Sequence, residues 1–268
     1  MGNHLVIGAS GVMGTAAIRA IRHHFGKEPI IIANWYGKED TGEQIEQADH
    51  TIFGDITDLD CLDKIKSISE GTFDFIYYAT ALGEVGFPIE QATPEEIAHS
   101  NSLSFDPIPV LEEKFEIGTI VAYSTFYLIK HQISSYGAMA YSKEAIEKWV
   151  VQPGKSKHAC IRAGLFPSHS SRAIKLLLRK MAKNVEKMND PLLLSYFKGV
   201  NSSEGIKRFE EGIFKEEEET YGDSRTDADS LYEAHLALFK SDNPVFVNIC
   251  GKKIWMSDTP LLIQSVIG

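Results

Sequence analysis

Residues 5–14 run Leu5-Val6-Ile7-Gly8-Ala9-Ser10-Gly11-Val12-Met13-Gly14. Three apolar residues typical of a buried strand lead into a G-x-x-G-x-x-G loop, and residues 12–25 then have the spacing of an amphipathic helix. Glycines let such a loop turn sharply and approach a diphosphate closely, and the free N–H groups at the start of the helix attract the phosphates. The pattern predicts a dinucleotide-binding loop whose contacts come from Gly8, Ser10, Gly11, Val12, Met13 and Gly14.

The chain continues as an alternation of short apolar runs and amphipathic stretches. Near-continuous apolar strands separated by helices indicate a parallel sheet that is covered on both faces. The sequence therefore predicts an α/β fold, a Rossmann-like doubly wound parallel sheet. The further strands are expected at 29–33, 51–53, 73–78, 119–123, 159–161 and 245–249.

The C-terminal third has a different character. A basic amphipathic helix is expected over 170–188, followed by a polar, acidic stretch over 190–224 and a helix over 227–240. We expect one Rossmann-type domain over residues 1–268, in which 167–224 form a small helical insertion, a lid that binds substrate over the carboxyl edge of the sheet. Apolar residues of the first helix, such as Ile174 and Leu178, either line a substrate pocket or bury against the sheet.

The composition excludes several classes of function. The chain has 268 residues and a net charge of −10, which leaves no basic footprint for nucleic acid. No apolar run reaches the roughly 20 residues that span a bilayer, and no basic segment with a cleavage site marks a secretory signal. We therefore expect no membrane partner. Because the histidines and the three scattered cysteines lack ligand spacing, we expect no metal site, and unpaired cysteines of this kind favour a cytoplasmic location.

Polar residues after the next two strands predict the adenosine side of the same site. In dinucleotide-binding folds an acidic residue about 20 positions after the loop binds the ribose of NAD, and here that place holds Asn34. Asn34 and the nearby Lys38 favour NADP over NAD, and Asn34 is equally explained as a turn residue. Asp55 could accept from the adenine amino group while Ile56 packs on the ring, and Asp58 could cap the next helix.

These motifs, in this order, resemble the short-chain dehydrogenases/reductases over nearly all of the chain. The resemblance implies an NAD(P) cofactor, with Lys143 beside the nicotinamide ribose and with Ala79, Thr80, Ala81 and Phe166 as further cofactor contacts. It also implies a homodimer or homotetramer. Besides the glycine loop it rests on Asp55-Ile56-Thr57-Asp58, Ala79-Thr80-Ala81, Ser124-Thr125, Ser142-Lys143-Glu144-Ala145-Ile146-Glu147 and Arg162-Ala163-Gly164-Leu165-Phe166-Pro167.

The catalytic segment departs from the usual family pattern. Most members carry Tyr-x-x-x-Lys, and with Lys143 as the lysine the tyrosine position holds Met139. The spacing from Tyr136 to Lys143 resembles that of the enoyl-acyl-carrier-protein reductases, a divergent branch whose glycine loop differs from this one. The resemblance implies that Tyr136 donates to the substrate oxygen and that Thr125 or Ser124 orients the carbonyl.

Each of these assignments has a structural alternative. Tyr136 could be a packing aromatic, Lys143 a surface helix residue and Thr125 a strand-end hydroxyl. Tyr141 is a second candidate donor, but two residues from Lys143 on a helix it points to another side.

The sequence thus predicts an NAD(P)-dependent oxidoreductase that transfers hydride to a C=O or conjugated C=C bond of a small-molecule or acyl-thioester substrate. The alternative follows from Met139 in place of the usual tyrosine. On that hypothesis the protein binds a dinucleotide without catalysis, as a redox sensor or regulatory protein.

Overall fold

A single mixed sheet forms the centre of the computed structural model, which describes residues 2–36, 44–181 and 189–267. Its strand order is β3-β2-β1-β4-β5-β6-β7-β8, and all neighbours are parallel except β7 and β8. The chain crosses between the two halves of the sheet beside β1, so the Rossmann-like doubly wound fold is confirmed. The strands are β1 (Asn3–Ile7), β2 (Ile30–Trp35), β3 (His50–Phe53), β4 (Thr72–Tyr78), β5 (Glu116–Thr125), β6 (Lys157–Ala163), β7 (Phe246–Cys250) and β8 (Lys253–Ser257).

Strand β8 is an addition that the sequence analysis does not predict. It pairs antiparallel with β7 across a turn in which Gly251 has a φ of +57°. Its side chains are half-buried or exposed, unlike the fully buried β7. Its sequence, Lys253-Ile254-Trp255-Met256-Ser257, has three apolar residues in a row, but so short a run directly after a turn gives only a weak signal for a separate strand.

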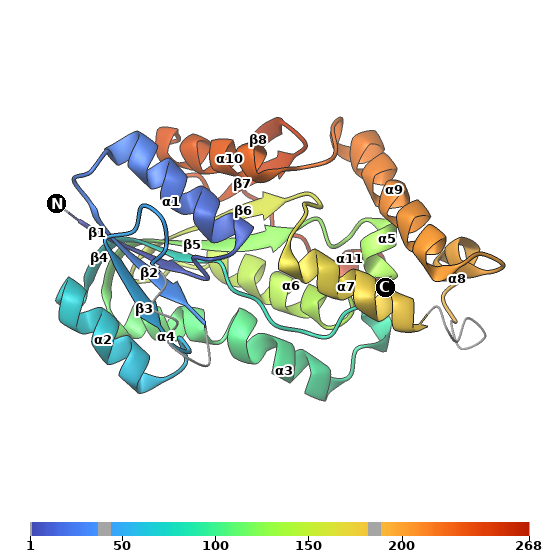
Figure 1. Cartoon of the computed structure of the whole chain (residues 1–268), viewed down its shortest axis with the longest axis horizontal. Helices are drawn as coiled ribbons and strands as arrows, with labels where there is room; N and C mark the ends of the chain where they lie inside the picture. Colours follow the sequence, from blue (N-terminus) through green and yellow to red (C-terminus); the bar gives the residue numbers. More distant parts are fainter. Residues whose placement is uncertain (1, 37–43, 182–188, 268) are drawn as a thin grey trace.

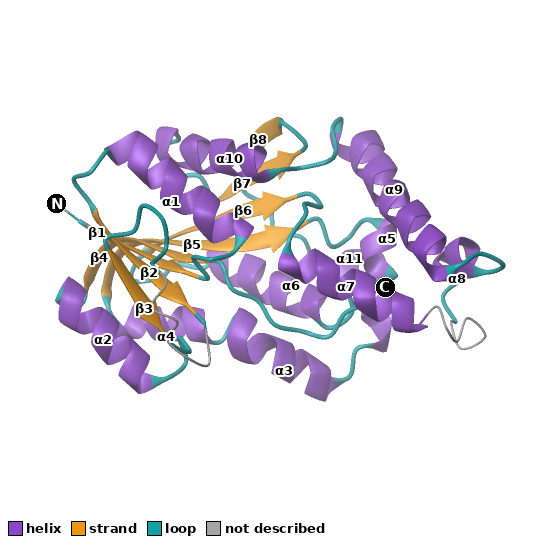
Figure 2. Cartoon of the chain, in the orientation of Figure 1, coloured by secondary structure: helices purple, strands orange, loops and turns teal. Residues whose placement is uncertain are grey.

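Helices cover both faces of the sheet (Figures 1 and 2). Helices α1 and α10 pack together on one face, whereas α2, α4 and α6 lie on the other and α3 packs on α6. The buried face of α1 includes Ala16, Ala17 and Ala20, small residues that let the helix lie close to the sheet. These helices are α1 (Val12–Phe25), α2 (Leu59–Ser69), α3 (Pro94–Ser104), α4 (Pro107–Lys114), α6 (Met139–Val150) and α10 (Ala228–Lys240), with a 3-10 turn η1 at Ile89–Gln91.

A second group of helices lies beyond the carboxyl ends of the strands (Figure 1). These are α5 (Lys130–Ile133), α7 (His169–Met181), α8 (Pro191–Phe197) and α9 (Ser202–Tyr221), and the short α11 (Gln264–Ile267) follows the last strand. Phe126, Leu178, Phe197 and Phe209 form a separate apolar cluster among them. The helix expected over 170–188 is described only as far as Met181, since 182–188 lie outside the described residues. None of the described helices is both long and apolar enough to cross a membrane.

Candidate active site

The glycine loop joins β1 to α1 in a conformation that glycine alone accommodates well. Gly8 has a φ of +77°, and a Cβ there would lie 2.7 Å from the carbonyl oxygen of Ala79. A Cβ on Gly14 would lie 2.5 Å from the carbonyl oxygen of Gly8. Both distances are shorter than any real Cβ contact, so side chains are excluded at the two ends of the loop.

Backbone hydrogen bonds hold the glycine loop in place and leave the N–H groups at the start of α1 free. The backbone N–H groups of Gly8 and Ala9 both donate to the carbonyl oxygen of Asn34, and the N–H of Gly11 donates to that of Gly8. Gly11 occupies the N-cap position of α1, and the first turn carries no acidic residue. The first N–H groups of a helix lack partners within it, so this end attracts an anion. The loop therefore fits a diphosphate.

A cavity of about 200 Å³ lies against this loop. It collects residues from the ends of β4, β5 and β6, from the start of α6 and from the first turn of α1. The other three loop residues predicted as contacts, Gly8, Ser10 and Gly14, do not line it, and Ser10 is exposed at the tip of the loop. The predicted residues that do line it are Gly11, Val12, Met13, Ala79, Thr80, Ala81, Ser124, Thr125, Tyr136, Lys143 and Phe166.

Lys143 is a buried residue of α6 rather than a surface lysine. Its Nζ donates to the carbonyl oxygen of Tyr123, at 3.0 Å, and it lines the cavity. Burial lowers the pKa of Lys143 to about 8, against the opposing effects of Cys160 and Glu147. The ammonium group is therefore held at the cavity wall and stays charged near neutral pH.

Tyr136 lies on the same cavity, immediately before α6. Its backbone N–H donates to the carbonyl oxygen of Gln132 at 2.7 Å, and its ring packs with Val85 and Met139. Burial raises the pKa of the Tyr136 phenol. Its hydroxyl makes no hydrogen bond within the described parts of the chain. Tyr141, the second candidate, does not line the cavity.

The two strand-end hydroxyls do not fit the role that the sequence analysis gives them. The Oγ of Ser124 donates to Glu147 Oε1 at 2.5 Å, and Glu147 forms a buried two-point ion pair with Arg162. The Oγ1 of Thr125 donates to the carbonyl oxygen of Ala163 at 2.8 Å. Since both protons are engaged, neither hydroxyl is placed to donate to a substrate carbonyl. Ser124 instead ties α6 to the sheet, and Thr125 links β5 to β6.

On the adenosine side, Asn34 is turned into the core. Only 2% of its surface is exposed, and its Nδ2 donates to the carbonyl oxygens of Ile52 and Gly54 in and after β3. The side-chain amide is thus engaged within the sheet, and its contact with a ribose stays a prediction. Its contribution to the site is its backbone oxygen, which holds the glycine loop. Lys38, predicted beside it, lies outside the described residues.

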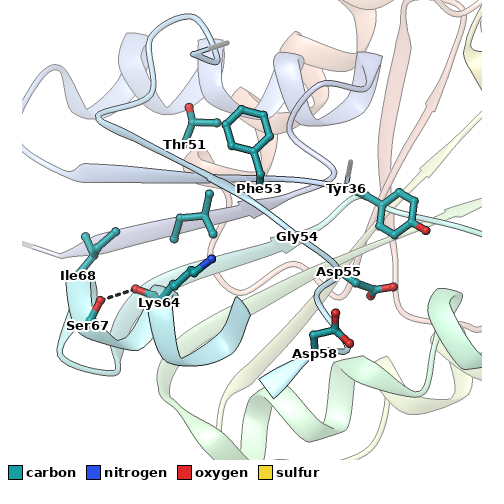
Figure 3. Close-up of a pocket in the computed structure, with 10 residues that line it drawn as sticks. Tyr36, Thr51, Phe53, Gly54, Asp55, Asp58, Lys64, Ser67 and Ile68 are labelled. Atoms are coloured by element: carbon teal, nitrogen blue, oxygen red, sulfur yellow. Dashed lines mark hydrogen bonds between the residues drawn. The ribbon is translucent and has the colours of Figure 1, made fainter. Parts of the chain in front are cut away.

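Asp55 and Ile56, predicted as adenine contacts, both have side chains that interact within the protein. Asp55 Oδ1 accepts from the backbone N–H and the hydroxyl of Thr57, which closes a tight turn. The Ile56 side chain is buried in the core, so it offers no face to an adenine ring. Asp55 does border a wide, open hollow of about 740 Å³ along β3 and α2, with Tyr36 and Asp58 nearby (Figure 3).

Further residues of the cavity come from α5, α7 and the segment after β6. Ile174 of α7, which the sequence analysis places either in a substrate pocket or against the sheet, lines the cavity, whereas Gln132 of α5 is not predicted and no motif marks it. Gly164 and Leu165 also line it, and their place within Arg162–Pro167 could have identified them. No group of three or more His, Cys, Asp or Glu side chains that could hold a metal ion occurs in the part of the chain that the structure describes.

The sequence and the structure were each compared with those of known proteins. No family model and no curated protein matches the sequence. Solved structures do match it. An NAD+-bound xylitol dehydrogenase aligns with a TM-score of 0.65 at 14% identity, covering 93% of this chain and 98% of its own. The fold is that of the short-chain dehydrogenases/reductases.

Two further structures support this statement about the fold. YwfH, an NADPH-dependent reductase involved in bacilysin biosynthesis, has a TM-score of 0.60 at 14% identity over 95% of this chain and 99% of its own. A short-chain dehydrogenase family protein from Francisella tularensis subsp. tularensis SCHU S4 has a TM-score of 0.58 at 18% identity, over 94% and 98%.

Within this short-chain dehydrogenase/reductase fold, Met139 and Lys143 lie one turn apart on α6 and both line the cavity. The position four residues before the lysine therefore faces the site and presents a thioether there. Tyr136, three residues earlier, lines the same cavity, whereas Tyr141, two residues later, does not.

Proposed function

We propose that this protein is an NAD(P)-dependent oxidoreductase that transfers hydride to a C=O or conjugated C=C bond of a small-molecule or acyl substrate. One observation carries the proposal. A single cavity joins an open helix amino terminus with a glycine loop, a buried ammonium group at Lys143 and a phenol at Tyr136. Two proteins of the same fold, the xylitol dehydrogenase and YwfH, are described as NAD+-bound and NADPH-dependent.

Each part has a defined task in this proposal. The N–H groups at the start of α1 hold the diphosphate, and Lys143 binds the nicotinamide ribose. The bound dinucleotide supplies the hydride. Tyr136 donates a proton to the oxygen on which negative charge develops. Burial raises the pKa of the Tyr136 phenol, so this group carries its proton at neutral pH and can donate it.

The finer assignments are also proposals. We favour NADP because the end of β2 carries Asn34 instead of an acidic residue that would repel a phosphate on the adenosine ribose. Helices α7, α8 and α9 within 167–224 are the elements that we assign to substrate binding. The resemblance implies a homodimer or homotetramer, and the scattered cysteines favour a cytoplasmic location.

The test is a comparison of Tyr136→Phe with Tyr141→Phe. Purified protein is mixed with NADPH or NADH and a panel of ketones, aldehydes and enoyl thioesters, and the absorbance of the reduced nicotinamide is followed. We expect Tyr136→Phe to lower kcat about a hundredfold or more, with unchanged dinucleotide affinity, because it removes only the proton donor. Tyr141→Phe, outside the cavity, is the control. Equal activity of the two variants would contradict the assignment of Tyr136.

The second candidate function is a dinucleotide-binding sensor without catalysis. The observation that favours it is the thioether of Met139 at the cavity wall, where the usual phenol is missing. Tight dinucleotide binding without turnover of any panel member, together with no effect of Tyr136→Phe, would support this alternative.

A further inference from the structure

Helices α5 and α7 both pack against α9 beyond the carboxyl ends of the strands (Figure 1). A second, narrow cavity between these three helices extends the candidate active site. Its volume is about 30 Å³, and it shares Gln132, Leu165, Ser171 and Ile174 with the larger cavity. The two spaces therefore meet at these residues. The narrow part is walled mainly by apolar side chains, Leu165, Ile174, Leu178, Ile206, Phe209 and Ile213.

Gln132 lies at the junction of the two cavities. Only 6% of its surface is exposed, and it lines both spaces. Among the side chains and backbone groups that the structure describes, none hydrogen-bonds to its carboxamide, and neither polar atom of the amide is one of the fully buried, unpartnered atoms, which are His158 Nδ1 and Glu217 Oε2. A carboxamide that lines a cavity in this way is available to pair with a ligand. A carboxamide both donates and accepts, which suits a neutral hydroxyl, carbonyl or amide group.

The position of Gln132 is fixed from both sides. The backbone N–H groups of Lys130 and His131 donate to the Glu216 carboxylate on α9, and the His131 ring also contacts it, at 2.5 Å. Although burial opposes it, these hydrogen bonds hold the pKa of Glu216 below its usual range. The carbonyl oxygen of Gln132 accepts from the N–H of Tyr136. The carboxamide is thus held one turn from the phenol that we assign to proton donation.

Other polar groups along the narrow cavity already have partners. The hydroxyl of Ser171 donates to the carbonyl oxygen of Ser168, and that of Ser135 donates to His131. At the cavity edge, Lys175 Nζ lies 2.5 Å from Glu210 Oε1, so this pair of charges is neutralised. Apart from Lys143, which the dinucleotide ribose engages, the described lining residues offer a substrate anion no unpaired cation.

We propose that the substrate is a neutral carbonyl compound that carries a second polar group and a slim apolar group. Gln132 binds the second polar group, and the cavity between α7 and α9 takes the apolar part. This inference rests on the proposed function, because it assumes that the reacting carbonyl lies beside Tyr136. It adds the substrate class and a specificity-determining residue on a helix that no motif marks.

The test uses two probes of the same skeleton, ethyl acetoacetate and the acetoacetate anion, with the protein loaded with reduced dinucleotide. Calorimetry first establishes that the dinucleotide binds, and turnover of each probe is then measured. We expect kcat/KM for the neutral ester to exceed that for the anion at least about tenfold, since burying an unpaired carboxylate is costly. An equal or higher value for the anion would overturn the inference, and this arm needs no variant.

The second arm is Gln132→Met, which keeps the length of the side chain and removes its hydrogen-bonding groups. We expect KM for the ester to rise about tenfold, the equivalent of one lost hydrogen bond, with kcat and dinucleotide affinity nearly unchanged. Gln152→Met, at an exposed position just after α6, is the matched control. An unchanged KM in a folded, dinucleotide-bound variant would overturn the role of Gln132.

The two proposals fail in different ways. If the dinucleotide does not bind, or if it binds and no carbonyl in the wider panel is reduced, the proposed function is wrong and this inference falls with it. If the dinucleotide binds and other carbonyls are reduced but ethyl acetoacetate is not, the proposed function stands and the substrate class is wrong.

Discussion

The two ends of the candidate dinucleotide site were predicted from the same kind of sequence pattern, yet the structure treats them differently. At the nicotinamide end, Thr80, Lys143 and Phe166 come from three different segments and line one cavity. At the adenosine end, Asn34 and Ile56 are buried in the core. The first end lies beside the central strands and α6, and the second lies beside β2 and the edge strand β3.

The difference has a physical cause. Strands β4, β5 and β6 are each flanked by a parallel neighbour on both sides, so their backbone groups are satisfied within the sheet. Residues just after their carboxyl ends are then free to face the crevice. Strand β3 has four residues and a neighbour on one side only, and the Asn34 amide donates to one carbonyl group within it and to that of Gly54 just after it. The polar side chain of Asn34 therefore stabilises the edge of the sheet by hydrogen bonds instead of facing the crevice.

The largest effect is expected at the nicotinamide end, from Lys143→Met. The variant keeps much of the side-chain volume and removes the ammonium group that we assign to binding the nicotinamide ribose. We expect kcat/KM to fall by about two to three orders of magnitude, with a clear loss of dinucleotide affinity. Lys148→Met is the control, because Lys148 is half exposed and its ion pair with Glu144 contributes little. Similar losses in the two variants would show that the charge at Lys143 has no special role.

The same residue predicts a pH dependence. Lys143 has a pKa of about 8 in the folded protein, so it is charged below that pH and neutral above it. Dinucleotide affinity should therefore be constant below about pH 8 and weaken above it. Calorimetric titrations across this range measure the change, and Lys143→Met should abolish the pH dependence. If the dinucleotide affinity of the unmodified protein does not change with pH across this range, Lys143 does not contact the bound cofactor.

A smaller effect is expected behind the nicotinamide end, at Glu217 of α9. Its carboxylate is buried, Oε1 accepts from the N–H of Leu165 at 2.6 Å, and Oε2 has no partner in the described structure. Burial raises the pKa of Glu217 from 4.5 to about 7, an effect that hydrogen bonds from Leu165 and Cys250 oppose and that Glu216 reinforces. The group therefore keeps its proton in the folded chain at pH values where the unfolded chain has released it.

The sign of the stability effect follows from this proton. Between about pH 4.5 and pH 7 the folded state binds one more proton than the unfolded state, so the free energy of unfolding falls as the pH rises, and it levels off above pH 7. The loss amounts to roughly 3 kcal/mol at most. Urea unfolding at several pH values should show this slope in the unmodified protein and a much weaker one in Glu217→Gln. Glu219→Gln, on the exposed face of α9, is the control and should keep the slope.

Sequence reasoning located the fold well because its strongest signals are local. The step from strand to glycine loop to helix requires the backbone geometry seen at Gly8 and Gly14, whatever surrounds it. The site was located in part. Spacing predicts that Lys143 lies beside the cofactor, and the structure puts it at the cavity wall, since a residue in the first turns of α6 lies near the carboxyl ends of the strands.

Some of the predicted side chains hydrogen-bond within the protein, in directions that depend on distant partners. The Ser124 hydroxyl is taken by Glu147, which lies 23 residues away, and the Asn34 amide by Ile52, which lies 18 residues away. Neither pairing follows from a motif. Gln132 was missed because its place in the cavity depends on contacts between α5 and α9, 85 residues apart.

The smallest effect is expected at the adenosine end, and it tests the comparison most directly. Asn34→Ala removes the donor to two carbonyl groups, so we expect a loss of stability of about 1–2 kcal/mol. Because the backbone oxygen that braces the glycine loop is retained, the ratio of NADPH to NADH affinity should stay the same. Asn3→Ala is a matched control at the opposite end of the sheet, where the amide also donates to two carbonyl groups, those of Ser69 and Thr72. If Asn34→Ala changes the cofactor ratio while Asn3→Ala does not, the Asn34 side chain reaches the ribose in solution, and the two ends of the site would be alike after all.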